Sequence, residues 1–202
     1  MFLLPPLVAL IFGFILFTVV TNTNIKATPQ QTGNTPLAPL FTPEVQYWAN
    51  DIVRWSSEHN IDPNITATIM QIESCGNPYA RSSAGAAGLF QVMPFHFASG
   101  ENSLDPDTNA MRGLDYLAKA LKYSGGDTRL AFAGYNGGIG VIDKSELGWA
   151  AETIRYVYWG TGIYADASQN SSSSSRLDEW LAAGGTSLCT NARQRLGILP
   201  GQ

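Results

Sequence analysis

The chain has 202 residues, enough for one domain of ordinary size with a sizeable core. Charged residues make up only 14% of it, and the formal net charge is −4. An acidic chain without a long run of like charges lacks the basic face that phosphate binding needs, so we expect no nucleic-acid partner.

Residues 1–20 form an apolar segment suited to a membrane. They read MFLLPPLVALIFGFILFTVV and hold no charged side chain, and about 20 apolar residues can span a bilayer. Because no Lys or Arg precedes the run and no clear A-x-A site follows it, an uncleaved anchor is favoured over a cleaved signal peptide. We therefore expect a membrane-anchored domain outside the cytoplasm, secreted if the segment is cleaved. Lys26, the nearest charge, weakly favours the opposite orientation.

The segment that follows is predicted to be a tether. Residues 21–40, TNTNIKATPQQTGNTPLAPL, are dominated by Thr, Asn, Gln and Pro and show no apolar period, which is typical of a disordered linker. After it we expect a globular domain over residues 41–165, a Ser-rich loop over residues 166–176, and a helical tail over residues 177–202 that packs on the domain.

Helix signals recur through the domain. A capping residue directly precedes a proline at Thr42–Pro43, Asp62–Pro63 and Asp105–Pro106, which marks a helix start. Apolar residues then follow at the spacing of an amphipathic helix. Shorter helices are expected at about residues 127–135 and 148–158. Because sustained strand alternation is absent, the predicted fold class is mainly α, a single globular helical domain behind the N-terminal transmembrane segment.

A lone acid closes the second of these helices. Glu73 ends the apolar run IMQIE and stands before the helix breaker Gly76–Asn77–Pro78. A helix C-terminus carries partial negative charge, and apolar neighbours exclude water, so both raise the pKa of a carboxyl group. These are the conditions for a general acid that keeps its proton near neutral pH. On this stretch alone, a solvent-exposed Glu at a frayed helix end is the commoner case.

Three further stretches accompany Glu73. The first, GAAGLFQVMP at residues 85–94, combines small residues that allow close backbone approach with the amide of Gln91 and the soft apolar side chain of Met93. The second, GYNGG at residues 134–138, puts a phenol at a helix end, and the third is ETIRYV at residues 152–157. Each stretch by itself is explained by ordinary helix packing or capping.

Taken in order, ESCGNP, GAAGLFQVMP, GYNGG and ETIRYV resemble the motifs ESxxxP, GAxGLMQxMP, AYNAG and ETxxYV of the lytic transglycosylases of the soluble, lysozyme-like type. The resemblance covers about residues 42–158 and implies a fold of the lysozyme-like α+β superfamily. It departs mildly at Phe90, Gly134 and Gly137, where the family has Met, Ala and Ala.

The resemblance implies a role for each matched residue. Glu73 corresponds to the family's single catalytic acid, and Tyr135 to the tyrosine that faces this acid across the cleft. The other matched residues are expected to hydrogen-bond near the acid or to line the sugar groove as substrate-binding residues: Ser82, Gln91, Met93, Asn136 and Glu152.

The implied reaction cleaves the β-1,4 bond between N-acetylmuramic acid and N-acetylglucosamine in peptidoglycan. Glu73 protonates the leaving oxygen while the substrate's N-acetyl group stabilises the charge at C1. The anionic Glu73 then takes the proton of the muramyl 6-hydroxyl, which closes on C1 to give a 1,6-anhydro end. Ordinary glycosidases need two carboxylates, and no second acid lies in the motif around Glu73. A hydrolytic lysozyme of the same superfamily and a non-catalytic cell-wall-binding module stay open as alternatives.

The chain has two cysteines, Cys75 and Cys189. Because disulfides persist outside the cytoplasm, we expect a bridge that clamps the tail against the turn after Glu73, with two unpaired thiols as the alternative. We expect neither a metal site nor a cofactor, since the chain has two histidines and no Cys or His cluster. His96 is expected to be structural.

Overall fold

The computed structural model of the protein describes residues 37–198. The predicted membrane segment, residues 1–20, and residues 21–36 of the predicted linker lie outside this range. Within residues 37–198, no helix combines the length and the apolar character that crossing a bilayer requires.

Residues 37–198 form helices joined by loops and no strand; the only strand-like pairing in this range consists of isolated antiparallel bridges at Ala87. The helices are α1 (Pro43–Gln46), α2 (Ala49–His59), α3 (Pro63–Glu73), α4 (Pro106–Tyr123), α5 (Thr128–Gly137), α6 (Ala151–Ser168), α7 (Ser175–Trp180) and α8 (Thr186–Leu196). Short helical turns lie at Pro94–His96, Ile139–Val141, Glu146–Gly148 and Leu181–Gly185. The predicted mainly α fold is confirmed.

Local capping explains where the longer helices begin. Asp62 and Asp105 each accept a hydrogen bond from a backbone N–H of the turn that follows, at 2.8 and 2.9 Å, as expected for N-caps. Thr42 makes no such cap, because its N–H and hydroxyl both donate to Oε1 of Gln71, at 3.2 and 3.1 Å. The helix that starts after Thr42 ends after 4 residues, and a separate helix, α2, follows.

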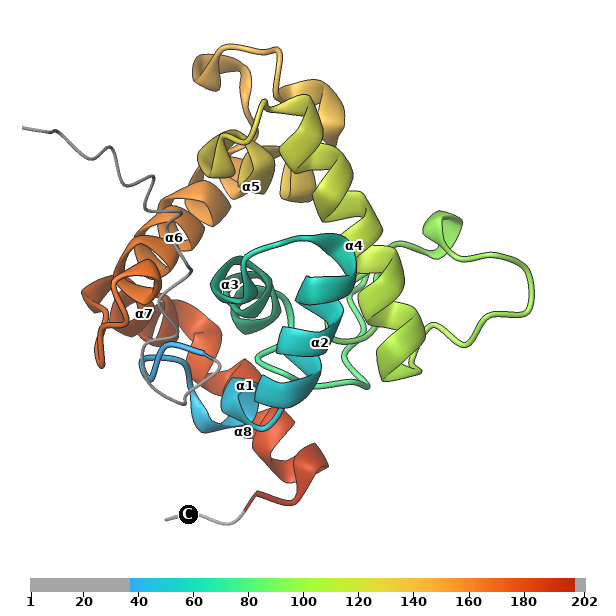
Figure 1. The fold of residues 1–202 in the computed structure, drawn as a ribbon, viewed down its shortest axis with the longest axis vertical. Coiled ribbons are helices and arrows are strands. Elements are labelled where there is room, and N and C mark those ends of the chain that lie inside the picture. Colours follow the sequence, from blue (N-terminus) through green and yellow to red (C-terminus); the bar gives the residue numbers. More distant parts are fainter. Residues whose placement is uncertain (1–36, 199–202) are drawn as a thin grey trace, which may run out of the picture. The chain divides into compact units, whose positions relative to one another are not determined.

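Helix α3 forms the centre of the fold. Every residue from Ile65 to Ile72 is buried, and α1, α2 and α6 pack against it. Figure 1 shows α3 in the middle, with α2, α5 and α6 around it. A helix that is covered on all sides has no face on which a charge can reach water, which explains the uncharged run that precedes Glu73. Glu73, the last residue of α3, is the one charged residue of this helix.

Two predicted boundaries differ from the structure. Leu37, Ala38 and Leu40, assigned to the end of the linker, are buried in the main core. Their apolar side chains gain more from burial than a tether gains from solvation, so the packed part of the chain begins before residue 41. The predicted Ser-rich loop, residues 166–176, is shorter, because α6 continues to Ser168 and α7 begins at Ser175.

The C-terminal helices belong to the same core as α3. Leu177 and Trp180 of α7 and Ala192 of α8 are buried in one cluster with the apolar residues of α3. Next to Ala192, Nε of Arg193 donates to Oε1 of Glu44 at 2.6 Å, and the Glu44 side chain is fully buried. The tail is thus held by apolar packing and by an ion pair that reaches back to α1.

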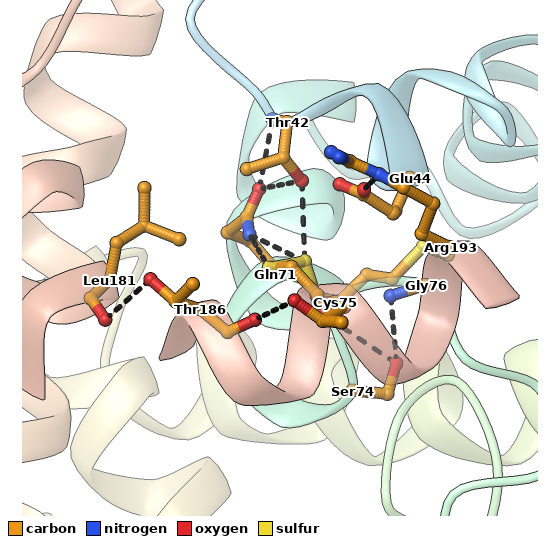
Figure 2. Close-up of a disulfide and its surroundings, with 12 residues drawn as sticks. Thr42, Glu44, Gln71, Ser74, Cys75, Gly76, Leu181, Thr186 and Arg193 are labelled. Atoms are coloured by element: carbon orange, nitrogen blue, oxygen red, sulfur yellow. Dashed lines mark hydrogen bonds and ion pairs between the residues drawn. A yellow bond between two sulfur atoms is a disulfide. The ribbon is translucent and has the colours of Figure 1, made fainter. Parts of the chain in front are cut away.

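A disulfide joins Cys75 to Cys189, as predicted from the sequence, with the two Cα atoms 5.0 Å apart. Figure 2 shows the bridge beside Gln71, whose amide donates to Sγ of Cys75 at 3.1 Å. The turn is tight, since Cys75 and Gly76 both have positive φ, at 50° and 81°. A Cβ at Gly76 would lie 2.6 Å from the carbonyl oxygen of Glu44, so only glycine fits there.

We expect the double substitution Cys75→Ser and Cys189→Ser to lower the free energy of unfolding. The bridge closes a loop across a sequence separation of 114 residues, for which chain entropy alone gives about 5 kcal/mol. Guanidinium unfolding monitored by circular dichroism measures the change. The natural chain treated with a reductant is the control and should lose a similar amount, whereas equal stability of variant and oxidised natural chain would contradict the prediction.

Candidate active site

Glu73 opens onto a pocket of ≈ 350 Å³ at the end of α3. The walls come from four helices: Ile72 and Glu73 of α3, Asn136 of α5, Glu152, Arg155, Tyr156 and Trp159 of α6, and Trp180 of α7. The Glu73 residue itself is half-buried. It therefore does not point freely into solvent from a frayed helix end, but faces a concave site built from segments far apart in the sequence.

The environment of Glu73 favours the protonated carboxyl group. Burial is the main cause and raises its pKa from the ordinary 4.5 to about 8, with a further contribution from the negative charge of Glu152. The nearby Tyr156 hydroxyl acts in the opposite direction and lowers this pKa, because it can donate to the charged form. At neutral pH, Glu73 therefore holds a proton that it can transfer.

Two tyrosines flank Glu73 in different ways. Burial, followed by the nearby Glu73 charge, raises the pKa of Tyr135 and of Tyr156 well above the ordinary value of 10, so both phenols stay protonated. The Tyr135 hydroxyl donates to the carbonyl of Phe90 at 2.8 Å. The Tyr156 hydroxyl is buried and has no hydrogen-bond partner within residues 37–198, so it stays available to a carboxylate on Glu73.

Asn109 of α4 holds the loop of residues 85–94 in place. Its Oδ1 accepts from the N–H of Phe90 at 2.9 Å, and its Nδ2 donates to the carbonyl of Ala87 at 2.8 Å. Gly88 has a φ of 77°, and a Cβ there would lie 2.3 Å from Nδ2 of Asn109. The fully buried amide therefore explains the glycine in this stretch and the path of the loop.

A second pocket, ≈ 50 Å³, has Tyr135 in its wall. Gln91 and Met93 line it together with His96, Tyr116 and Tyr135. The rings form a row, with centroids 4.6 Å apart for His96 and Tyr116 and 5.9 Å apart for Tyr116 and Tyr135. Helix α5 contributes to both pockets, since Asn136, the next residue after Tyr135, lines the Glu73 pocket.

The predicted site residues fall into three groups. Asn136 and Glu152 line the pocket with Glu73, and Oδ1 of Asn136 accepts from the hydroxyl of Thr153 at 2.8 Å. Gln91, Met93 and Tyr135 line the second pocket. Ser82 lines neither of these two pockets.

Ser82 lies in an exposed turn instead. Its Oγ accepts from the N–H of Ala86 at 3.0 Å, and its own N–H donates to the carbonyl of Ala86 at 3.0 Å. The hydroxyl is thus used within its own turn, as is usual for serine near a bend. The expectation that Ser82 hydrogen-bonds near the acid stays a prediction.

Sequence reasoning passed over several residues of the Glu73 pocket. Arg155 and Tyr156 lie inside ETIRYV, so a signal for them was present in the motif. His96, expected to be structural, lines the second pocket. Trp180 lies 21 residues after Trp159 in the numbering of the chain and outside every motif, so only the packing of α7 could reveal it.

One group of potential metal ligands lies together in residues 37–198, namely Glu44 with Cys75 and Cys189. Both sulfurs are bonded to each other, so neither can act as a thiolate ligand. The group is part of the clamp on the tail.

A family model described as the transglycosylase SLT domain matches residues 51–154 of the chain. The transglycosylase of Enterobacteria phage PRD1 is 36% identical over 112 residues, which is 54% of this chain and 40% of that protein. The soluble lytic murein transglycosylase of Escherichia coli K12 is 33% identical over 118 residues, which is 52% of this chain and 18% of that protein. The chain thus spans less than half the length of either relative.

Among solved structures, the 70 kDa soluble lytic transglycosylase of Escherichia coli superposes with a TM-score of 0.45 and 24% sequence identity, over 73% of this chain and 24% of that one. The family model covers more than half of the chain and includes Glu73, Gln91, Tyr135 and Glu152. The protein therefore belongs to the transglycosylase SLT domain family.

Proposed function

We propose that the protein is a peptidoglycan lytic transglycosylase in which Glu73 acts first as a general acid and then as a general base. The observation that carries the proposal is the raised pKa of Glu73, about 8, at a pocket lined by residues of the family's motifs. Relatives named as transglycosylases support the assignment. We also assign the fold to the lysozyme-like superfamily.

The proposed reaction needs one group that is an acid in the first step and a base in the second. The protonated Glu73 gives its proton to the oxygen that leaves the muramyl C1, and the substrate's N-acetyl group stabilises the positive charge. The resulting carboxylate accepts the proton of the muramyl 6-hydroxyl as that oxygen bonds to C1. A carboxyl group with a pKa near the working pH serves both steps, and the Tyr156 hydroxyl favours the anion between them.

The pocket also gives a reason to test hydrolysis. Glu152 is distant from Glu73 in sequence, yet its carboxylate lines the same pocket. Two carboxylates at one site are the usual equipment of a glycoside hydrolase, so a lysozyme-type reaction is the second candidate. We favour the transglycosylase, in which the charge of Glu152 raises the pKa of Glu73 and thereby keeps the acid protonated.

We further propose that residues 1–20 anchor the protein and that its domain works outside the cytoplasm, either tethered through the linker or released by cleavage. The disulfide supports this location, since such bonds persist in oxidising compartments. In this arrangement residues 177–202 form a tail that supports the catalytic domain, and peptidoglycan strands are the substrate.

We expect Glu73→Gln to lower the rate of peptidoglycan lysis by about 100-fold or more, because an amide cannot supply the proton of the first step. Release of soluble fragments from purified peptidoglycan measures the rate, and the mass of the sugar ends of the natural enzyme's products identifies the reaction. A 1,6-anhydro end is lighter by one water than a hydrolysed end.

The matched control is Glu58→Gln, which neutralises an exposed glutamate on α2 and should leave lysis unchanged. Full lysis by Glu73→Gln would contradict the role of Glu73. Hydrolysed ends alone would favour the lysozyme-type reaction over the transglycosylase.

The rate of lysis should fall as the pH rises through about 8, because Glu73 then loses the proton that the first step requires. Glu152→Gln removes a charge that raises this pKa, so the fall should move to lower pH. Tyr156→Phe removes a donor to the carboxylate, so the fall should move to higher pH. Initial rates across the pH range measure both shifts, and shifts in the same direction would contradict the assigned influences.

Protonation of Glu73 should also appear in stability. Between pH 4.5 and about 8, the unfolded chain ionises Glu73 while the folded chain keeps it protonated, so stability falls as the pH rises through this window. Glu73→Gln has no charge to bury. Its stability relative to the natural chain should therefore increase from pH 5 to pH 8, by roughly 1–3 kcal/mol. Urea unfolding at the two pH values measures this change. An equal difference in stability at both pH values would contradict the raised pKa of Glu73.

A further inference from the structure

A further pocket lies between the segment of residues 77–81 and helix α8, and it shares no lining residue with the Glu73 pocket. It has a volume of ≈ 510 Å³ and is open to solvent. Its lining consists of Asn77, Tyr79, Ala80 and Arg81 from the loop, and Leu188, Asn191, Gln194 and Arg195 from α8. Every charged side chain in this lining is a guanidinium, although the chain as a whole has a net charge of −4.

The two arginines of this pocket differ from most others in the structure. Residues 37–198 contain eight arginines, and five of them form ion pairs with carboxylates: Arg54, Arg112, Arg129, Arg176 and Arg193. Of the other three, Arg155 lines the Glu73 pocket, whereas Arg81 and Arg195 both line this one. Guanidinium groups without a carboxylate partner in this range therefore occur at pockets, where a ligand can supply the anion.

The remaining polar groups of the pocket are suited to a peptide. On α8, the side-chain hydrogen bonds to oxygen within residues 37–198 come from Thr186, Thr190 and Arg193. The amides of Asn191 and Gln194 are thus available to donate to and accept from a peptide backbone.

The pocket also has two large apolar side chains in its lining. Tyr79 and Leu188 line opposite walls and are 57% and 38% exposed. They supply apolar surface beside the two cations, against which the methyl groups of a peptide can pack.

The pocket is connected to the turn that follows Glu73, both along the chain and through the disulfide. Asn77 follows Glu73 by four residues, so their Cα atoms are at most about 14 Å apart. On the other wall, Leu188 is next to Cys189, which is bonded to Cys75. Helix α8 lies outside the segment that the family model matches, residues 51–154, so half of the pocket is supplied by the tail of this chain.

We propose that this pocket binds the carboxylate-bearing stem peptide of peptidoglycan. Arg81 and Arg195 pair with the peptide's free carboxylates, Asn191 and Gln194 bond its backbone, and its alanine methyl groups lie against Tyr79 and Leu188. The inference rests on the proposed function, because peptidoglycan as substrate is what brings this peptide to the protein. The tail then adds contact with the substrate's peptide to the family's contact with its sugars.

The test compares Arg81→Gln plus Arg195→Gln with Lys122→Gln plus Lys144→Gln. Both double variants of the full chain lose two positive charges, and all four side chains are exposed. The probe is the free tetrapeptide L-alanyl-γ-D-glutamyl-meso-diaminopimelyl-D-alanine, with binding measured by calorimetry. We expect the arginine variant to bind it at least about tenfold more weakly than the natural chain and the lysine variant to bind it equally well.

Two further arms identify the ligand and the place. The same peptide with its carboxylates amidated should bind the natural chain about tenfold more weakly or worse, since it carries no anion. Asn191→Trp, which fills the pocket without changing charge, should weaken binding of the acidic peptide to a similar degree. Unchanged binding in the arginine variant, or tighter binding of a phosphate polymer than of the peptide at the same arginines, would overturn the proposal.

The outcomes separate this inference from the proposed function. Peptide binding requires no cleavage, so it is measured independently of lysis. If the natural chain cleaves peptidoglycan but the arginine variant binds the peptide normally, the inference fails and the function stands. If the natural chain binds the peptide through Arg81 and Arg195 but cleaves no peptidoglycan, the function fails and the peptide site stands.

Discussion

Burial of α3 on every side is the constraint on which the site depends. A helix enclosed by its neighbours carries its last residue, Glu73, out of the core and directly to a pocket. Removal of water from the carboxyl group is the largest cause of its raised pKa, because a charge loses more solvation there than a neutral acid does. The same apolar packing that stabilises the fold thus favours the protonated form of Glu73.

The turn after Glu73 converts this burial into a fixed position. The Ser74 hydroxyl donates to the carbonyl of Leu89 at 2.7 Å, and Nε1 of Trp48 donates to the carbonyl of Gly76 at 2.9 Å. Figure 2 shows the disulfide on the side of this turn that faces α8. The left-handed conformation of Cys75 is costly for a residue with a side chain, and the surrounding bonds hold it in place, whereas Gly76 adopts its positive φ at little cost.

The C-terminal helices α7 and α8 each line one of two pockets. Trp180 of α7 closes the Glu73 pocket, and Arg195 of α8 lines the proposed peptide pocket. The fully buried Glu44 and the disulfide fix α8 between these places. A segment outside the matched family region is therefore joined by the disulfide to the turn after Glu73, so the linings of both pockets are held by the same contacts.

Local signals in the sequence by themselves determined the helical class, the helix starts at Asp62 and Asp105, and the candidate acid Glu73, since capping, apolar spacing and short motifs act over a few residues. Only the tertiary structure decided that Arg155 and Trp180 line the pocket of Glu73 and that the Ser82 hydroxyl bonds within its own turn. These outcomes depend on how whole helices pack against each other, and the spacing of residues along the chain does not encode that packing in any local pattern.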